Sequence, residues 1–204
     1  MNNQENLKNI ALYSNLVGAI GLLIWWFSMP VFLPVSEATE DFSKMILDTD
    51  WIWVNSLGLM AVLLLILGFP SYYFKDFHKY DKLGLAGLIL SILGLVLYAC
   101  IQYYETLIWP AAGQLNPELI QVEGALVSGN TGVAAGLLIS GIILSVGYVL
   151  FGISALRNKI HSRIPVWLLI VGAPLFGIGI AFMVRTVGII LFGIGTIWLT
   201  RTRL

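Results

Sequence analysis

The stretch "LGLAGLILSILGLVLYACIQYYETL" (residues 83–107) decides the class of fold, because no charged side chain precedes Glu105 in it. A helix needs about 20 mainly apolar residues to cross a bilayer, since the hydrocarbon core is about 30 Å thick. The stretch is long enough to do this, and near its end two tyrosines stand beside a carboxylate at 103–105. We interpret it as a membrane-spanning helix whose polar end lies at a membrane interface.

The composition of the whole chain supports the same interpretation. Of its 204 residues, 58% are hydrophobic and only 11% are charged, whereas a soluble domain carries about 25% charged residues. The formal net charge is zero, so a nucleic-acid partner, which requires clustered positive charge, is disfavoured. The single cysteine, Cys100, lies inside an apolar run and cannot form an intrachain disulfide.

Six segments have the length and hydropathy of membrane spans. They run over residues 10–33, 52–73, 83–107, 133–156, 165–184 and 186–200. The last two come from one stretch, 164–200, which as a single helix would be about 55 Å long and would overshoot the membrane. A hairpin near Arg185–Thr186 is therefore expected. The sequence predicts an all-α fold: a polytopic integral membrane helical bundle, one domain over residues 1–204, with six transmembrane helices arranged as three hairpins.

The distribution of basic residues predicts the orientation of these helices, because cytoplasmic loops carry an excess of lysine and arginine. Nine basic residues fall at one set of span ends: Lys8, Lys75, Lys79, Lys82, Arg157, Lys159, Arg163, Arg201 and Arg203. The opposite ends hold only Lys44 and Arg185, with most of the acidic residues: Glu37, Glu40, Asp41, Asp48, Asp50, Glu105, Glu118 and Glu123. Both termini are therefore expected in the cytoplasm, in a multi-pass protein of the plasma membrane, as in many short prokaryotic membrane proteins.

Two outer loops, 35–50 and 110–131, are longer than a turn requires. In the first loop the apolar side chains fall on one helical face, and Ser36 is a candidate N-cap. In the second, Asn116 followed by Pro117 is typical of a helix start. Both loops are expected to form short helices, which either cap the bundle or dock a membrane protein partner.

Glu105 and Arg185 are the charged residues of greatest interest. Counted from Leu83, Glu105 lies about 33 Å along the third helix, at the outer edge of the hydrocarbon. Arg185 is the only charge in the apolar stretch 164–200 and is expected at the same depth. Aromatic residues suited to a membrane interface accompany them: Tyr103, Tyr104, Trp109, Trp25 and Trp26. Two interpretations stay open, a simple interfacial belt or a contact between Glu105 and Arg185 inside the bundle.

No catalytic or metal constellation can be identified in the sequence. His78 and His161 both lie in the predicted cytoplasmic links. One cysteine and two histidines do not supply the three or four nitrogen and sulfur ligands of a usual metal site. The sequence also contains neither a GxSxG nucleophile elbow nor a GxxxxGK[ST] phosphate loop. A non-enzymatic protein without cofactor is therefore expected.

Small residues and one proline predict how the helices pack. Pro174 removes a backbone hydrogen bond and is expected to kink the fifth helix, and broken helices occur at transporter binding sites. Small residues at four-residue spacing predict close helix packing, with homo-oligomer contacts as an alternative. They are Gly132, Gly136 and Ser140 in the fourth helix, and Ala173, Gly177 and Ala181 in the fifth.

These observations leave two functions open. The first is a non-catalytic accessory or interaction subunit of a membrane complex, which fits the structured outer loops and the scarcity of polar residues in the spans. The second is a small transporter or a binder of an apolar ligand (lipid, quinone or pigment) at the outer-leaflet side. An apolar cavity opening between the helices would favour the binder. A solid core with an exposed apolar outer loop would favour the interaction subunit.

Overall fold

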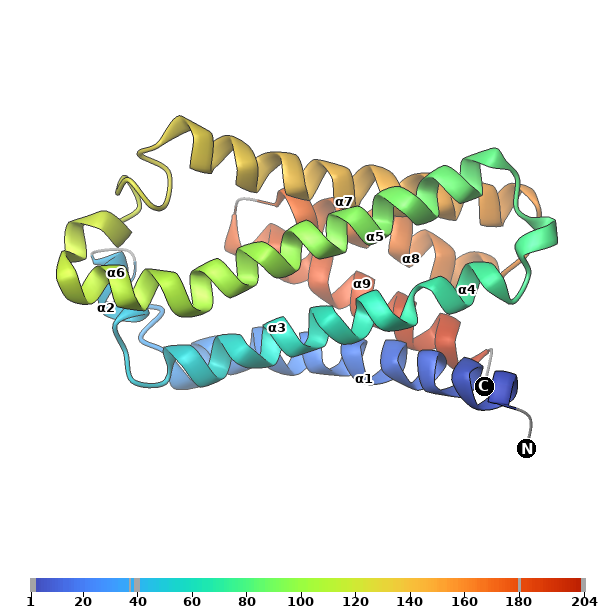
Figure 1. Ribbon diagram of the computed structural model, residues 1–204, viewed down its shortest axis with the longest axis horizontal. Coiled ribbons are helices and arrows are strands. Elements are labelled where there is room, and N and C mark those ends of the chain that lie inside the picture. Colours follow the sequence, from blue (N-terminus) through green and yellow to red (C-terminus); the bar gives the residue numbers. More distant parts are fainter. Residues whose placement is uncertain (1–2, 37, 39–40, 180, 203–204) are drawn as a thin grey trace.

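The computed structural model describes residues 3–36, 38, 41–179 and 181–202, and over these residues the chain is entirely helical apart from its turns and loops (Figure 1). The predicted charges Glu37, Glu40 and Arg203 lie outside the described residues. The long helices are α1 (Asn3–Phe32), α3 (Trp51–Gly68), α5 (Lys82–Tyr103), α7 (Thr131–Arg157), α8 (Arg163–Ile178) and α9 (Phe182–Arg201).

Short helical elements join or extend the long ones. The α4 helix (Pro70–Phe74) prolongs α3, and a 3₁₀ turn, η2 (Phe77–Lys79), leads to α5. The third long helix continues through a π-helical segment, η3 (Tyr104–Ile108), into α6. The loop elements are α2 (Phe42–Ile46), α6 (Trp109–Leu115) and the 3₁₀ turn η4 (Pro117–Ile120).

The bundle has two distinct ends. Figure 1 shows α2 and α6 at one end, which we call the loop end, and both chain ends at the other, which we call the terminal end. The segments 74–82 and 157–163 also lie at the terminal end, since the long helices run alternately in opposite directions. The loop segments expected outside the membrane are therefore together at one end of the molecule.

Five helical stretches of the described chain are long and apolar enough to cross a membrane. They are Asn9–Phe32, Trp51–Phe74, Lys82–Leu115, Thr131–Arg157 and Phe182–Arg201. By length and hydropathy the chain is thus a multi-pass membrane protein, whose exposed apolar helix faces contact lipid. The remaining predicted span, 165–184, corresponds to α8, which is apolar but only 16 residues long.

The turn between α8 and α9 differs from the prediction. The helix α8 ends at Ile178, so the turn lies at residues 179–181 and not near Arg185–Thr186. A Cβ at Gly179 would lie 2.1 Å from the carbonyl oxygen of Leu175, so only glycine fits the chain exit there. Arg185 consequently belongs to the first turns of α9, and the Thr186 hydroxyl donates to the carbonyl of Phe182.

The helices α7 and α8 cross at Gly141 and Gly177, so the prediction of close packing holds for Gly177 of α8 but not for Gly132 and Gly136 of α7. A Cβ at Gly141 would lie 1.9 Å from the carbonyl oxygen of Gly177, so the two backbones touch there. Gly136 has no neighbouring atom within 4 Å of such a Cβ, and Gly132 is exposed. The loop-end part of α7 therefore stands away from α8, and the close contact lies one turn further along.

The packed core fills the terminal half of the bundle with aromatic rings. Phe69 lies 4.7 Å from Tyr148 and 4.9 Å from Phe151 between ring centroids, and all three side chains are buried. Tyr148 in turn packs edge-on against Phe192 of α9. These rings hold α7 and α9 against the end of α3. The helix α5 joins the same core because it packs closely along α7.

Candidate ligand-binding cavity at the loop end

A cavity exists at the loop end because the α8–α9 hairpin is short. With 16 residues, α8 is about 24 Å long, and Figure 1 shows its turn ending well before α2 and α6. The space between this turn and the loop elements holds a cavity of about 340 Å³. Helices α1, α3, α5 and α9 supply its walls, and α2 and α6 lie across it.

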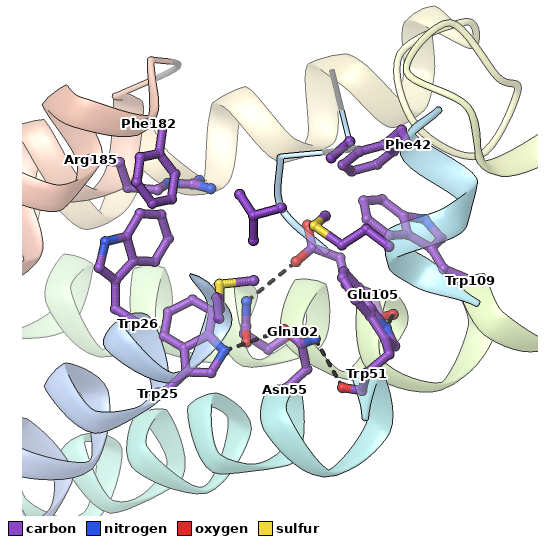
Figure 2. A pocket seen from close by; sticks show the side chains of 14 residues that line it. Trp25, Trp26, Phe42, Trp51, Asn55, Gln102, Glu105, Trp109, Phe182 and Arg185 are labelled. Atoms are coloured by element: carbon purple, nitrogen blue, oxygen red, sulfur yellow. Dashed lines mark hydrogen bonds between the residues drawn. The ribbon is translucent and has the colours of Figure 1, made fainter. Parts of the chain in front are cut away.

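Aromatic side chains dominate the lining. Figure 2 shows their rings arranged around a common space, from helices far apart in the sequence. The aromatic lining residues are Trp25, Trp26, Phe42, Trp51, Trp109 and Phe182, and the aliphatic ones are Met29, Val35, Ala38 and Met45. Four polar side chains complete the lining: Asn55, Gln102, Glu105 and Arg185.

Hydrogen bonds fix the tryptophan rings in place. The indole Nε1 of Trp25 donates to Asn55 Oδ1 at 3.3 Å, and that of Trp26 donates to Thr186 Oγ1 at 2.9 Å. The indole Nε1 of Trp109 donates to the carbonyl of Leu126 at 3.1 Å. Because each indole N–H has a partner in the protein, the rings present mainly their carbon surfaces to the cavity.

The π-helical segment explains the position of Glu105 and of Trp51. In this segment the N–H of Trp109 donates to the carbonyl of Tyr104, five residues back. The residue five positions after Glu105 is Pro110, which has no N–H to donate. The Glu105 carbonyl is thus left without a helical donor, and Trp51 Nε1 supplies one at 2.9 Å. Proline therefore creates the backbone irregularity that ties α3 to the site.

The polar side chains of the cavity are incompletely partnered. Gln102 Nε2 donates to Glu105 Oε2 at 3.3 Å, but Gln102 Oε1 is buried without a hydrogen-bond partner. Arg185 Nε is also buried without one. Within the residues that the structure describes, no ion pair at or below 4.0 Å joins Glu105 to Arg185. Buried polar atoms of this kind normally bind water or a ligand.

A cap over the cavity joins the first outer loop to the second. Asp41 accepts hydrogen bonds from the Ser43 N–H at 3.1 Å and from Gln121 Nε2 at 2.5 Å. The Ser43 hydroxyl, followed by the Gln121 amide, holds the pKa of the Asp41 carboxyl below its usual value. Asp41, and not the predicted Ser36, is thus the N-cap of α2. The expected helix start at Asn116 is confirmed, since its Oδ1 accepts the N–H of Glu118 at 3.0 Å.

A second cavity, of about 480 Å³, adjoins the first. It lies between α5, the loop-end part of α7 and the end of α8, and its lining is mainly apolar, with Ile101, Leu137 and Leu138 as examples. Glu105 and Arg185 line both cavities. These two charged side chains therefore stand where the two cavities meet.

The structure places most of the predicted site residues together. Trp25, Trp26, Trp109, Glu105 and Arg185 all line the first cavity. The side chain of Tyr104 lies behind Trp109, with its hydroxyl donating to the carbonyl of Leu126 at 3.1 Å. Tyr103 lines neither cavity, and 53% of it is exposed. Pro174 also lines neither, and because α8 continues through it, its expected kink stays a prediction.

The uncharged polar residues of the site were not predicted. Asn55 lies four residues after Trp51, and Gln102 lies three residues before Glu105, so each pair shares one helix face. That spacing was the available signal.

Nowhere in the described ranges do three or more histidine, cysteine, aspartate or glutamate side chains gather as metal ligands would. No protein-family model matches the chain, and no curated protein and no solved structure matches it either.

Proposed function

We propose that this protein binds a small amphipathic molecule in the loop-end cavity, at the outer face of the plasma membrane. The observation that carries this proposal is the pair of buried, unpartnered polar atoms, Gln102 Oε1 and Arg185 Nε, at one aromatic cavity. An orphaned buried polar group costs about 1–3 kcal/mol, so its retention is most simply explained by a partner that the chain itself does not supply.

The shape and chemistry of the cavity support the same conclusion. Ligand pockets typically enclose about 300–1,000 Å³, with apolar walls and a few polar groups that fix orientation. The first cavity, at about 340 Å³, lies within this range and has an aromatic wall with four polar side chains. A bundle evolved only for packing would fill such a space with side chains.

The orientation of the bundle decides on which side of the membrane the cavity lies. The chain crosses the membrane six times, with α8 as a short span, and the basic links and both termini face the cytoplasm. The basis is the positive-inside rule applied to residues 74–82 and 157–163. The cavity at the opposite end then faces the outer leaflet and the space beyond it.

The proposed role is non-catalytic. Among the described residues that line it, the first cavity has one carboxylate and one guanidinium but no serine, cysteine, lysine or histidine that would serve as an activated nucleophile beside a base. Binding, or binding followed by passage of the ligand, is the activity that these groups support. The protein needs no cofactor for either.

A second candidate function is an interaction subunit of a membrane complex. The observation in its favour is Leu115, which ends α6 with 88% of its surface exposed at the loop end. Leu115→Ser would weaken such an association while leaving ligand binding unchanged. Native mass spectrometry of the complex, compared with that of the single chain, measures this effect.

The main proposal is tested by filling the cavity. Met29 lies in the cavity wall on α1, and Met29→Trp would occupy the ligand space. Met60 faces outward from α3 with 56% of its surface exposed, so Met60→Trp is the matched control. Native mass spectrometry of gently extracted protein should show a retained small molecule in the wild type and in Met60→Trp, and not in Met29→Trp. A wild type that retains nothing would contradict the proposal.

A further inference from the structure

We propose that the ligand is a zwitterionic phospholipid whose ammonium group lies at Glu105, whose phosphate lies at Arg185 and whose acyl chain occupies the second cavity. This inference rests on the proposed binding function and adds the class of ligand. It is argued from three features of the site: the two opposite charges, the tryptophan wall and the apolar cavity that begins between the charges.

The charges of the site favour a ligand that carries both signs. Glu105 and Arg185 line the same two cavities, yet in the described chain no ion pair joins them. A charge in a dry environment is costly unless it is paired. An anionic ligand would pair Arg185 and leave Glu105, and an uncharged ligand would leave both. A zwitterion compensates both charges and adds no net charge to the site.

The two charges also stand on opposite sides of the first cavity. Figure 2 shows Arg185 beside Phe182 and Trp26, and Glu105 across the space near Trp109 and Gln102. The ring of Trp26 stacks on that of Phe182 at 4.9 Å, which fixes the arginine side of the cavity. A head group with separated charges spans this arrangement, whereas a compact ion would reach only one side.

The tryptophan wall on the glutamate side suits an ammonium group. Trp51 and Trp109 stack at a centroid distance of 6.3 Å, and Trp51 Nε1 donates a hydrogen bond to the Glu105 carbonyl. Since the indole N–H groups are already occupied, the electron-rich ring faces remain, and these attract cations. A guanidinium group is well suited to the phosphate, because its planar N–H donors match phosphate oxygens.

The second cavity provides the space for an acyl chain. Its wall on α7 includes Leu137 and Leu138, and 48% of Leu138 is exposed on the outward surface of the bundle. Gly136 has open space around it, so α7 leaves room beside α8 in this region. A chain that leaves the head-group cavity between Glu105 and Arg185 therefore passes through an apolar channel to the lipid-facing side.

The inference is tested by the selectivity of lipid retention. The full chain is placed in nanodiscs of equimolar phosphatidylcholine and phosphatidylglycerol with identical acyl chains, and retained lipids are counted by native mass spectrometry. Phosphatidylcholine should be enriched. Arg185→Gln and Glu105→Gln should each reduce its retention about tenfold, the factor expected from losing one charge-assisted hydrogen bond.

Matched variants separate a specific effect from misfolding. Arg157→Gln and Glu118→Gln remove the same charges at exposed positions and should leave the enrichment unchanged. Arg185→Lys keeps the charge and should restore part of the selectivity lost in Arg185→Gln, which a merely unfolded variant would not show. Ala134→Trp would obstruct the second cavity, and it should reduce retention of phosphatidylcholine but not binding of glycerophosphocholine, which has no acyl chain.

The outcomes distinguish this inference from the proposed function. If the wild type retains no amphipathic molecule, both fail. If it retains one without preference between the two lipids, or if Arg185→Gln leaves the preference intact, the inference fails and the binding function stands. Enrichment of phosphatidylglycerol that is lost in Arg185→Gln would overturn the zwitterion in favour of an anionic lipid.

Discussion

The two ends of the bundle contain similar residue types arranged in different ways. At the terminal end the Tyr80 hydroxyl and His161 Nε2 are hydrogen bonded at 2.8 Å. Asp81 there accepts from the Ser154 hydroxyl at 2.5 Å and from the Gly84 N–H at 3.0 Å. Polar side chains at this end bind one another across helices. At the loop end, by contrast, Glu105 and its neighbours face a cavity.

The aromatic rings show the same contrast. Tyr80 stacks on Phe151 at 5.1 Å, and Phe151 packs against Phe69, so the rings of the terminal end fill the space between helices. The rings of Trp51 and Trp109 also stack, but they form the wall of an open space. The comparison shows a packed end and an end with a cavity, which is the end that the proposed binding function would use. It predicts that substitutions at the terminal end will lower the free energy of unfolding, whereas substitutions at the loop end will mainly change ligand retention.

The largest expected effect is loss of stability at the terminal end. Phe151 is 1% exposed and contacts Phe69, Tyr80 and His161. Phe151→Ala removes those contacts and leaves a cavity, which typically costs about 3–5 kcal/mol. The free energy of unfolding, measured by titrating the detergent-solubilised protein with dodecyl sulfate, should fall by that amount. Phe27→Ala on the lipid-facing side of α1 is the control, and an equal loss there would contradict the comparison.

The next effect in size is a dependence of stability on pH at the terminal end. The Ser154 hydroxyl, followed by the Gly84 N–H, holds the pKa of Asp81 below its ordinary value of 3.8. Its stabilising contribution is therefore complete above that value and is lost as the pH falls through the lowered pKa. The midpoint of thermal unfolding should drop more steeply below about pH 4 in the wild type than in Asp81→Asn, which keeps a capping side chain but does not titrate.

A second aspartate with a lowered pKa, Asp41, lies at the loop end and tests whether the cap contributes to stability as the terminal end does. The pKa of Asp41 is also lowered, but this residue holds the cap over the cavity and not the packed core. Asp41→Ala, which removes the acceptor of the Ser43 and Gln121 hydrogen bonds, should leave the thermal midpoint close to that of the wild type and increase quenching of tryptophan fluorescence by acrylamide. A fall in the midpoint as large as that of Phe151→Ala would mean that the cap belongs to the stable core.

Hydropathy predicted the long spans because each is an apolar stretch with at most one charged residue, long enough to cross a membrane. The rise of 1.5 Å per residue also placed Glu105 and Arg185 at one depth, and both line the same cavities. The position of the last hairpin was predicted wrongly. The prediction relied on the charge of Arg185, whereas the chain turns at residues 179–181, where the exit from α8 leaves no room for a Cβ at Gly179.

The cavity itself could not be predicted, because it depends on lengths and register in three dimensions. The shortness of α8 matters only relative to the loops that extend past its turn. The π-helical segment likewise depends on Pro110, five residues after Glu105, together with a donor from another helix, Trp51. The spacing of Glu105 and Pro110 can be read from the sequence. The approach of Trp51 to the Glu105 carbonyl depends on how α3 packs against α5.

A smaller effect is expected where α3 is tied to the π-helical segment. Trp51→Phe keeps a ring in the cavity wall but removes the donor to the Glu105 carbonyl. The expected loss of unfolding free energy is about 1 kcal/mol, typical of one hydrogen bond. Trp53 makes a comparable bond to Asp50 at an exposed position, so Trp53→Phe is the control and should change little. Ligand retention should fall only in Trp51→Phe.

The smallest expected effect concerns the energetic coupling between Glu105 and Arg185 in the ligand-free protein. Since Glu105 and Arg185 line the same cavities but no ion pair joins them within 4.0 Å, the coupling between Glu105→Gln and Arg185→Gln in unfolding free energy should be well below the ~3–5 kcal/mol typical of breaking a buried direct pair. A double-mutant cycle in uncharged detergent measures the coupling. Repeating it with phosphatidylcholine added should produce a clear coupling, because both charges then bind one molecule. A strong coupling without lipid would instead place the two side chains in a structural pair, as in the terminal end, and would remove the distinction between the ends.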